Sequence, residues 1–523
     1  MMRKALGRAA LRLWRSGLPE STRKSGQTTF RRASMGAAAC AILLLAGCTV
    51  GPNYKRPIAK APPAFKEQPP PNFKEADAAG WKQAHPGDAF LKGKWWEVYQ
   101  DPALNALEEQ VVLNNQNVLQ AEAQFRQAKA AVRVARSALF PTVGTGVTTT
   151  VSRAQGGTGG NGNSGSSSPG ARVVYSLPLD AAWEPDLWGS IRRGVTGAAA
   201  TAQSFAAEVE NARLLYQSEL ASDYFQMHSI DAEIDLLKRT EASYAEYLTL
   251  TQNRYRGGVA SDLDVAQAES QLYGAQSSLI DLGVDRAAFE HAIAVLIGKA
   301  PVEVTLPPAL LATLPPPVPI GVPSQLLERR PDIAASERRV AAANEQIGIA
   351  MAAFYPNLTL SGSIGLQNST ISKVISAPTY LWSLGGSLAY TLFDAGRRRA
   401  IVVSEQAAYD ATVAAYRETV LTAMQQVEDN LAALRILETE AAKLEQTISS
   451  AQRALNISSA QYRAGTTSYL TVLTSQAQLL TAQRTAVNLQ SRRLTASVQL
   501  IEAIGGGWNA SQLPSTQSVT SSN

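Results

Sequence analysis

Four stretches of the chain alternate between apolar and small polar residues, the pattern of β-strands whose two faces meet different surroundings. In residues 142–151 valine and threonine occupy the odd positions, and glycine and threonine occupy the even ones. Three later stretches carry Leu, Ile, Tyr or Trp on one face and mostly Ser, Thr, Asn, Gly or Asp on the other. Strands are therefore predicted at about 140–153, 171–184, 356–368 and 380–393.

Long stretches without glycine or proline predict helices of unusual length. Residues 397–464 contain neither residue type and are bounded by Gly396 and Gly465. At about 1.5 Å per residue, one continuous helix of this kind would reach about 100 Å. Globular helices usually span about 8–20 residues, so this helix is too long for a compact enzyme domain. A second helix is predicted to return after the turn at Gly465.

The same plan occurs twice in the chain. At an offset of 207 residues, 116 consecutive positions starting at Trp183 align without a gap. The alignment pairs Gly189 with Gly396 and Tyr255 with Tyr462. An ungapped alignment of this length is implausible by chance, so we interpret the chain as one unit used twice.

Prolines and polar residues divide the chain further. Proline clusters indicate an extended segment near the start and a linker between the two repeats. The last residues are polar, and we expect them to be disordered. The predicted segments are a lipoprotein signal peptide (1–47), a lipid-anchored extended segment (48–100), the first repeat (101–298), a proline-rich linker or equatorial region (299–330), the second repeat (331–508) and a polar disordered tail (509–523).

The positive charge of the chain is concentrated in its first 47 residues. They carry nine Lys or Arg and one Glu, a net charge of +8. Because the whole chain has a net charge of +5, the remainder carries −3. A nucleic-acid function therefore loses its main support. Residues 36–46 form an apolar run that is too short to span a bilayer but suits a signal peptide.

The signal ends at Leu45-Ala46-Gly47-Cys48, which resembles a bacterial lipobox. That resemblance implies cleavage before Cys48 and a lipid on its thiol. The following residue is Thr and not Asp, which favours the outer membrane. An ordinary cleavage site beside an unrelated cysteine is the alternative. Cys40 is the only other cysteine, so the mature chain would have no disulfide.

The predicted strands have lengths that suit a tilted crossing of a bilayer. Within lipid every backbone N–H and C=O needs a partner, so such a sheet has to close on itself. Four strands are too few, because membrane barrels start at about eight. Two copies would give a barrel filled by side chains, whereas three copies would leave room for a lumen. A soluble β-sandwich is the alternative for this pattern.

Six motifs carry a specific resemblance that covers essentially all of the mature chain. They are CTVGPNY at 48–54, WW at 95–96, SDLDVAQAE at 261–269, ERRPDI at 328–333, FYPNL at 354–358 and GGGW at 505–508. Together they resemble the outer membrane factor family, also called outer membrane efflux proteins, of the TolC/NodT type in its lipoprotein branch.

The resemblance implies an α+β membrane protein that forms a homotrimer. Its twelve-stranded transmembrane β-barrel, with four strands from each chain, would continue as a long periplasmic α-helical barrel. The implied function is the exit duct of a tripartite efflux system, which passively exports drugs or small molecules. The implied partners are a periplasmic membrane-fusion adaptor, an inner-membrane pump of the resistance–nodulation–division (RND) type and outer-membrane lipid.

The family's functional zone is the periplasmic tip, where adaptors dock and the pore is held shut. The residues matched to it lie at the two predicted turns, and helix capping by the glycines is the plainer reading of the same residues. They are Arg256, Gly257, Gly258, Val259, Ala260 and Ser261 in the first repeat, and Arg463, Ala464, Gly465, Thr466, Thr467 and Ser468 in the second.

One departure from the family concerns acidic residues near the tip. Many relatives carry carboxylates where this chain has Thr467 and Thr474, whereas the first repeat keeps Asp262 and Asp264. A ring of carboxylates in a closed pore favours cations and can help to gate it. We therefore hypothesise that any acidic ring comes from Asp262 or Asp264.

No enzymatic chemistry is predicted. The three histidines are scattered, and no spacing of His, Cys or carboxylates indicates a metal site. No phosphate-binding or dinucleotide-binding glycine motif is present. Apart from the lipid on Cys48, no cofactor is expected. The alternatives to a drug-efflux duct are a duct for type I protein secretion and a non-conducting structural surface lipoprotein.

Overall fold

The computed structural model describes residues 49–59, 61–67, 93–153, 171–311, 314–316 and 323–521. The predicted signal peptide and Cys48 lie outside this part of the chain. Contacts group the chain into two compact units, the first containing Met1–Asn53, Val134–Thr196 and Asn344–Gln406. The second unit contains the remaining segments, so each unit includes parts of both predicted repeats. Among the described residues, no helix combines the length and apolar character needed to cross a bilayer.

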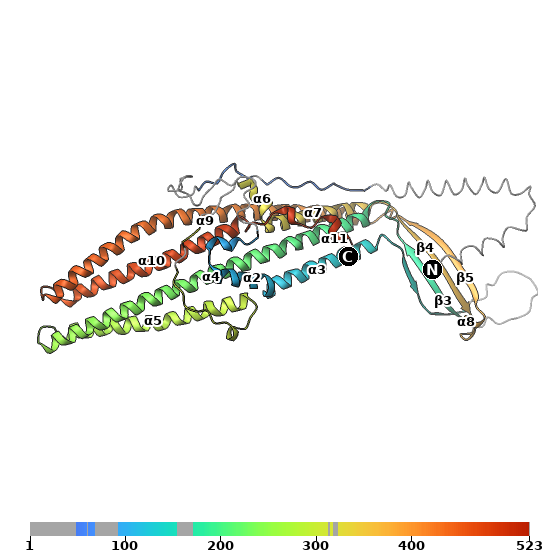
Figure 1. Cartoon of the computed structure of the whole chain (residues 1–523). Helices are drawn as coiled ribbons and strands as arrows, with labels where there is room; N and C mark the ends of the chain where they lie inside the picture. Colours follow the sequence, from blue (N-terminus) through green and yellow to red (C-terminus); the bar gives the residue numbers. More distant parts are fainter. Residues whose placement is uncertain are drawn as a thin grey trace, which may run out of the picture. The chain divides into compact units, whose positions relative to one another are not determined.

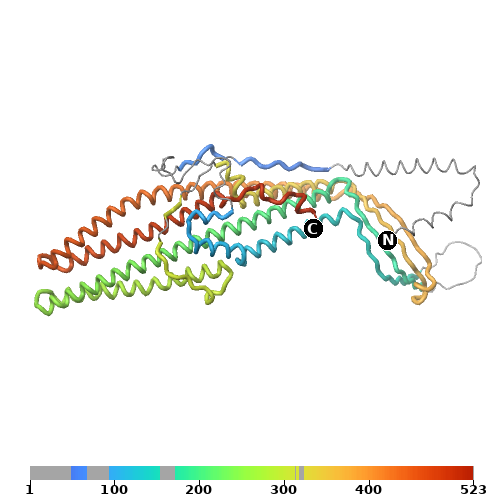
Figure 2. Tube along the Cα trace, in the orientation of Figure 1, coloured from blue at the N-terminus to red at the C-terminus, as the bar shows by residue number. Residues whose placement is uncertain are grey.

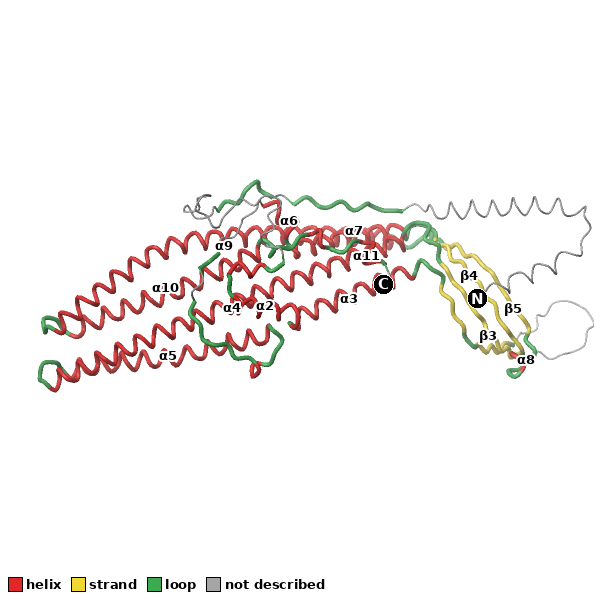
Figure 3. Tube along the Cα trace, in the orientation of Figure 1, coloured by secondary structure: helices red, strands yellow, loops and turns green. Residues whose placement is uncertain are grey.

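The first unit is built around one antiparallel sheet (Figure 3). Its order is β1-β3-β4-β5, with β2 paired to β3 beside β1. The two central strands, β3 and β4, come from different repeats, and the short helix α8 (Lys373–Ser376) connects β4 to β5. The strands are β1 (Thr142–Thr145), β2 (Thr148–Ser152), β3 (Arg172–Trp183), β4 (Asn357–Asn368) and β5 (Thr379–Ala389).

The first predicted strand is divided in two, and Pro178 explains the division. The register pairs Thr145 with Leu179 and Thr148 with Ser176, which places Gly146 opposite Pro178. Proline has no backbone N–H, so the ladder loses a hydrogen bond at this point. The pairing resumes in the same register beyond it. The sequence pattern predicted a strand at about 140–153 but not this break.

The register places most of the large apolar residues of the strands on one face. Leu179, Ile364 and Trp382 form one row across the sheet and are 48%, 59% and 77% exposed. The row on the opposite face consists of Asp180, Ser363 and Ser383. An apolar face of this kind would be the core of a soluble sandwich, but here it is exposed in the single chain. Further exposed apolar residues of the sheet are Val143, Val151, Trp183, Tyr380, Leu384 and Leu388.

The start of the described chain is docked in the first unit. Arg193 Nε donates to the carbonyl of Val50 at 2.7 Å, and its Nη1 forms a buried ion pair with Glu345 at 2.8 Å. A Cβ atom on Gly51 would lie 2.6 Å from the Cα of Gly348, and one on Gly348 would lie 2.4 Å from the Arg193 side chain. The start of the segment that we predicted to be extended and lipid-anchored is therefore held in a narrow slot.

Two long helical hairpins dominate the second unit (Figure 1). Helix α4 (Ser190–Arg256) and helix α9 (Arg397–Arg463) have 67 residues each. Their return helices, α5 (Asp262–Leu296) and α10 (Tyr469–Ala503), have 35 residues each. The predicted uninterrupted helices are confirmed, and the corresponding helices of the two halves have equal lengths.

Shorter helices abut the ends of the return helices. In the first half α2 (Pro102–Asn114) and α3 (Gln116–Ser137) are separated at Asn115, whose side chain donates to the carbonyl of Leu296 at the end of α5 at 2.9 Å. In the second half α6 (Leu326–Arg329) precedes α7 (Pro331–Ala352). Arg330 donates to the carbonyl of Ala503 at the end of α10 at 3.0 Å. Each return helix is thus continued by a short helix of its own half.

The main hydrophobic core of the second unit lies around these junctions. The 3-10 helix η1 (Trp95–Tyr99) buries both tryptophans of the WW motif, Trp95 and Trp96. Phe225 from α4 packs against Tyr99 with ring centroids 4.9 Å apart. The core includes residues from α2, α4, α5, α7, α9 and α10. Glu108 of α2 is completely buried within this region.

The inter-repeat linker is fixed to the first hairpin by a buried carboxylate. Asp231 of α4 accepts from Arg286 Nε at 2.7 Å and from the backbone N–H of Ala309 at 3.2 Å. Burial alone would raise the pKa of Asp231, but hydrogen bonds from His228 and Arg286 hold that pKa below its ordinary value. The described linker contains η2 (Pro301–Glu303) and ends at η3 (Pro323–Gln325).

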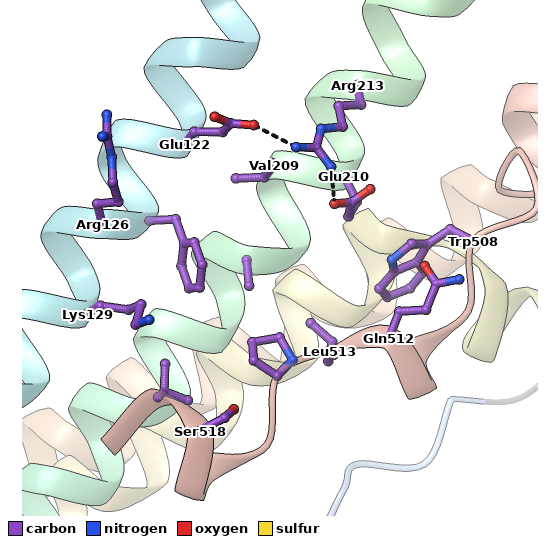
Figure 4. Close-up of a pocket in the computed structure, with 14 residues that line it drawn as sticks. Glu122, Arg126, Lys129, Val209, Glu210, Arg213, Trp508, Gln512, Leu513 and Ser518 are labelled. Carbon is purple, nitrogen blue, oxygen red and sulfur yellow. Dashed lines mark hydrogen bonds and ion pairs between the residues drawn. The ribbon is translucent and has the colours of Figure 1, made fainter. Parts of the chain in front are cut away.

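The prediction of a disordered C-terminal tail is wrong for its described residues. They form η4 (Ala510–Gln512) and α11 (Thr516–Thr520). Val519 is 2% exposed and packs with Ala128 and Val132 of α3 and with two alanines of α4. The tail also covers one side of a cavity of about 540 Å³ whose other walls are α3 and α4 (Figure 4). Leu513 also packs against the cluster around Trp508, and Gln203 of α4 donates to the carbonyl of Pro514 at 2.9 Å, so several contacts hold a segment whose composition is mostly polar.

Candidate functional site at the two helical turns

The turn between α4 and α5 ends the first long helix with a Schellman motif. Gly258 has φ of +72°, a conformation that glycine adopts at little cost. The N–H of Val259 donates to the carbonyl of Arg254 at 2.8 Å, and the N–H of Gly258 donates to Tyr255 at 2.9 Å. These bonds satisfy carbonyls that would otherwise be left unpaired at the helix end.

The turn between α9 and α10 has the same backbone construction. Gly465 has φ of +78°. The N–H of Thr466 donates to the carbonyl of Gln461 at 2.9 Å, and the N–H of Gly465 donates to Tyr462 at 3.0 Å. The two predicted turns therefore match each other in hydrogen bonding as well as in sequence position.

The start of the return helix differs between the two turns. Ser261 and Asp264 form a reciprocal capping box: Asp264 N–H donates to Ser261 Oγ at 3.2 Å, and Ser261 N–H donates to the Asp264 carboxylate at 2.9 Å. Ser468 makes no such side-chain cap. At its turn the Thr467 and Thr471 hydroxyls are 3.1 Å apart. A carboxylate thus stabilises only the first turn.

Arg254 connects the two turns. Its Nη1 donates to the backbone carbonyl of Tyr462 at 2.7 Å, and the guanidinium carbon lies 4.6 Å from the centre of the Tyr462 ring. The acceptor belongs to the last turn of α9, where carbonyls attract positive charge. Because Arg254 belongs to α4, this contact holds the ends of the two hairpins at the same level.

An aromatic cluster packs behind the turns. It contains Tyr247, Tyr462 and Tyr469, together with Ala268 and Val472. The rings of Tyr462 and Tyr469 are tilted with their centres 5.5 Å apart. Burial raises the pKa of Tyr469, so its hydroxyl stays protonated at neutral pH. The cluster gives the turns a rigid base, so their exposed residues are presented on fixed helix ends.

The predicted tip residues lie together at the two turns, and most are exposed. Val259 is 68% exposed, and Arg256, Ser261 and Asp262 are also exposed. In the second turn Arg463, Ala464, Gly465, Thr466 and Ser468 are exposed, whereas Thr467 is half-buried. Asp264 takes part in the capping box, whereas Asp262 does not. The lipidation residue Cys48 lies outside the described residues.

Three residues of this site were missing from the sequence-based prediction. They are Arg254, Tyr247 and Tyr469. The repeat alignment could have pointed to Arg254, because its equivalent in the second repeat is Gln461. The arginine is therefore present in the first repeat alone. Tyr469 aligns with Asp262, so a buried ring in one half occupies the position of an exposed carboxylate in the other.

The described residues contain no group of three or more His, Cys, Asp or Glu side chains placed to hold a metal ion. The arrangement at the turns offers hydrogen-bonding groups, exposed apolar residues and charges on rigid helix ends. It is suited to binding another macromolecule.

Comparison with known proteins identifies relatives over most of the chain. The sequence profile of the family described as "Outer membrane efflux protein" matches residues 107–299 and 322–506. The pyoverdine export outer membrane protein OpmQ of Pseudomonas putida is 30% identical over 444 residues, covering 84% of this chain and 94% of that protein. OpmQ of Pseudomonas aeruginosa is 32% identical over 421 residues, covering 80% and 88%. The solved outer-membrane channel OprN aligns with a TM-score of 0.79 and 28% identity, covering 88% of this chain and 100% of that one.

Proposed function

The chain belongs to the outer membrane efflux protein family, and from this premise we propose that three copies close their sheets into one twelve-stranded barrel in the outer membrane. The long helices of the three copies would continue that barrel through the periplasm. The protein is an outer-membrane exit duct for efflux and not an enzyme, as its family is one of transport ducts.

The sheet supports the trimer through its open edges. The outer strands β1 and β2 on one side and β5 on the other have one paired neighbour each. Backbone groups at such edges need partners inside a membrane. Trp382 and Leu384 of β5 are 77% and 83% exposed, as expected for side chains that face lipid. Joining β5 of one copy to β1 and β2 of the next would pair both edges.

The proposed partners are a periplasmic membrane-fusion adaptor and an inner-membrane pump of the RND type. The exposed residues of the two turns, Arg256–Ser261 and Arg463–Ser468, are the proposed adaptor-docking surface. Their support is geometric, since a rigid aromatic base and the Arg254 contact present both turns together. Asp262 and Asp264 are the proposed contributors to a gate or selectivity ring.

The proposed anchor is a lipid on Cys48. Docking of Val50 and Gly51 in the slot beside Arg193 supports it, because the lipid-bearing end would leave the protein from a fixed place. Lipid and sheet would then both hold the protein in the outer membrane.

The proposed cargo is a drug or another small molecule. OpmQ is named for pyoverdine export, and other relatives are named for solvents, toluene and antibiotics. A passive tube need not bind its cargo specifically, so the pump would decide what is exported.

The observation that carries the proposal is the combination of a sheet with two open edges, an exposed apolar face and two 67-residue helices. Its test is complementation. A bacterial strain with an intact adaptor and RND pump but no outer-membrane duct is supplied with the full chain, and accumulation of a fluorescent pump substrate is measured. We expect accumulation to fall to the level of the complete system. Unchanged accumulation, with trimer present in the outer membrane, would contradict the assignment to this pump class.

A further inference from the structure

The cavity of about 540 Å³ beside the C-terminal tail has no part in the proposed export path. Helices α3 and α4 form two of its walls, and the segment from Trp508 to Val519 forms the third. All of these residues belong to the second unit of one chain. Figure 2 shows the segment as the dark red end of the tube. Pockets that bind small molecules usually have volumes of about 300–1,000 Å³, so this cavity is large enough for one.

Much of the wall is apolar, and all three segments contribute to it. Phe125 of α3 and Leu513 of the tail are half-buried. Val209 of α4 and Trp508 are 5% and 8% exposed. In Figure 4 the side chains of Trp508 and Leu513 lie across the cavity from Lys129 of α3. Walls of this kind bind an apolar body, and the two aromatic side chains favour a body that contains rings.

One part of the wall carries charges that already have partners. Arg213 of α4 donates to Glu122 of α3 at 2.6 Å and to Glu210 of α4 at 2.8 Å (Figure 4). Burial raises the pKa of Glu210, and the charge of Arg213 acts in the opposite direction. Because two carboxylates already match Arg213, this cluster links α3 to α4 and is not the part of the wall that would hold an anion.

The other basic side chains of the wall lack such partners. Arg126 and Lys129 are three residues apart on α3, which places them on the same side of the helix. Neither forms an ion pair with any described residue. The amine of Lys129 lies 5.9 Å from the centre of the Phe125 ring, and Figure 4 shows it directed towards the cavity. Two positive charges therefore border the apolar wall without a carboxylate to neutralise them.

The second repeat has different side chains at the equivalent positions of α9. Val209 corresponds to Tyr416, and Arg213 corresponds to Val420. Tyr416 and Val420 are 1% and 2% exposed and belong to the main hydrophobic core. The first repeat thus has a small side chain where the second has a ring, and a charge where the second has an apolar side chain. The residues that form the cavity are therefore specific to the first repeat.

We propose that this cavity binds an amphipathic anion, a molecule with a ring-containing apolar body and one carboxylate, sulfonate or phosphate group. The body packs between Phe125 and Trp508, and the anionic group accepts charge-assisted hydrogen bonds from Lys129 and Arg126. The site lies within one chain, so it depends neither on the proposed trimer nor on the cargo of the duct. Because the tail supplies one wall, the bound ligand also stabilises α11.

Dansylglycine, a fused ring system with one carboxylate, is the probe that tests the site in the full chain. The protein is placed in nanodiscs of zwitterionic phosphatidylcholine, so that no detergent competes, and fluorescence anisotropy is measured. We expect saturable binding of a single ligand per chain. Dansylglycine amide keeps the rings but lacks the charge, and its affinity should be about tenfold lower. Sodium sulfate, an anion without an apolar body, should not displace the probe at equal concentration.

Variants connect the binding to this cavity. Arg126→Gln with Lys129→Gln removes both charges from its border, and we expect the affinity for dansylglycine to fall about tenfold. Arg133→Gln is the matched control and should bind like the parent, because Arg133 is an exposed basic residue of α3 that does not line the cavity. Val209→Phe places a ring where the second repeat has Tyr416, so it should fill the cavity and abolish binding.

Hydrogen exchange locates the ligand independently. Dansylglycine should slow exchange in residues 513–521 of the parent, because these residues include α11, and should have little effect there in the double glutamine variant. Competition then distinguishes two sources of such an anion. Displacement of the probe by soluble 2-naphthoate alone indicates a free organic acid, and displacement by phosphatidylglycerol added to the nanodisc indicates a membrane lipid. Displacement by neither would overturn the proposal.

Two further outcomes would also overturn it. One is equal affinity of the parent and the double glutamine variant for dansylglycine, and the other is the absence of saturable binding to parent protein of native mass. The double variant alone decides the matter if Val209→Phe does not fold, since both of its substitutions are polar residues at the border of the cavity. Either outcome leaves the proposed duct intact, because complementation of efflux does not involve this cavity.

Discussion

Arg254 is a residue of α4 whose strongest contacts are with α9. In the second half the equivalent residue is Gln461, which lacks a positive charge. An arginine from α4 alone therefore joins the ends of α4 and α9, which are otherwise similar. The Arg254 guanidinium is half-buried, so its hydrogen bond to the Tyr462 carbonyl is partly protected from water.

Removal of Arg254 should loosen the tip. Arg254→Ala loses a charge-assisted hydrogen bond and a cation–π contact, together about 1–2 kcal/mol at a half-buried site. We expect faster hydrogen exchange in residues 459–466, measured by mass spectrometry. Arg256→Ala is the control, because exposed Arg256 makes only a long hydrogen bond of 3.5 Å, to the side chain of Asn253, among the described residues. Equal exchange in both variants would show that Arg254 does not hold the turns.

The two carboxylates near the first turn should have separable roles. Asp264 caps α5, whereas Asp262 is exposed. Asp262→Asn should therefore reduce cation preference in single-channel recordings, and Asp264→Asn should mainly weaken the start of α5, by about 1 kcal/mol. If both variants keep the parent's selectivity and opening, the acidic-ring hypothesis fails.

Glu108 should make stability depend on pH. Burial raises the pKa of Glu108 well above its ordinary value of 4.5. The native state therefore keeps its proton after the unfolded chain has lost it. This contribution to stability is fully present below about pH 4.5 and is lost as the pH rises towards the folded pKa.

Replacing Glu108 by glutamine removes this titration. The stability of Glu108→Gln relative to the parent should increase as the pH rises from about 4.5 towards the raised pKa of Glu108, by at most about 1.4 kcal/mol per pH unit. Denaturant midpoints at several pH values measure it. The neighbouring Glu109→Gln is the control, because Glu109 is exposed and pairs with Lys94. A stability difference that does not vary with pH would indicate that Glu108 is ionised in the fold.

At the scale of elements, periodicity predicted most of what the structure contains. Helix α9 was predictable because its 67 residues include no glycine or proline, which leaves few alternatives to a continuous helix. The division of the first strand was not, because it depends on Pro178 in a partner strand. The ordered tail was missed because its few apolar residues, among them Leu513 and Val519, pack against distant parts of the chain despite a polar composition. Both misses concern contacts between segments distant in the sequence.

The slot that holds Val50 and Gly51 could not be predicted from the sequence either. The sequence contains the motif CTVGPNY at 48–54, but the motif does not show that Gly51 lies against Gly348. The contact joins the N-terminal segment to α7, while Arg193 contributes from α4. Elements of both repeats thus build a place for a segment that precedes them.

An added methyl group in this slot should displace the segment. In Gly348→Ala the new Cβ would lie 2.4 Å from the Arg193 side chain, which is held by Glu345 and Val50. We expect a loss of about 1–3 kcal/mol and faster trypsin cleavage after Lys55. Gly194→Ala is the matched control in α4, where a Cβ meets no atom within 4 Å. Equal cleavage of the two variants would mean that the segment is not held by the slot.

At the scale of the whole molecule, the single chain leaves several surfaces without partners. The edges of the sheet are open, and its apolar face is exposed. The sequence indicated several copies by the number of strands alone.

The central claim is that copies of this chain enclose a water-filled path. Conductance of the purified full chain in a planar bilayer tests it most directly, with Arg254→Ala recorded beside the parent because a loosened tip should open more often. The account predicts discrete conductance steps in both proteins and a higher open probability in the variant. A membrane-inserted trimer that conducts no ions in either form would contradict it.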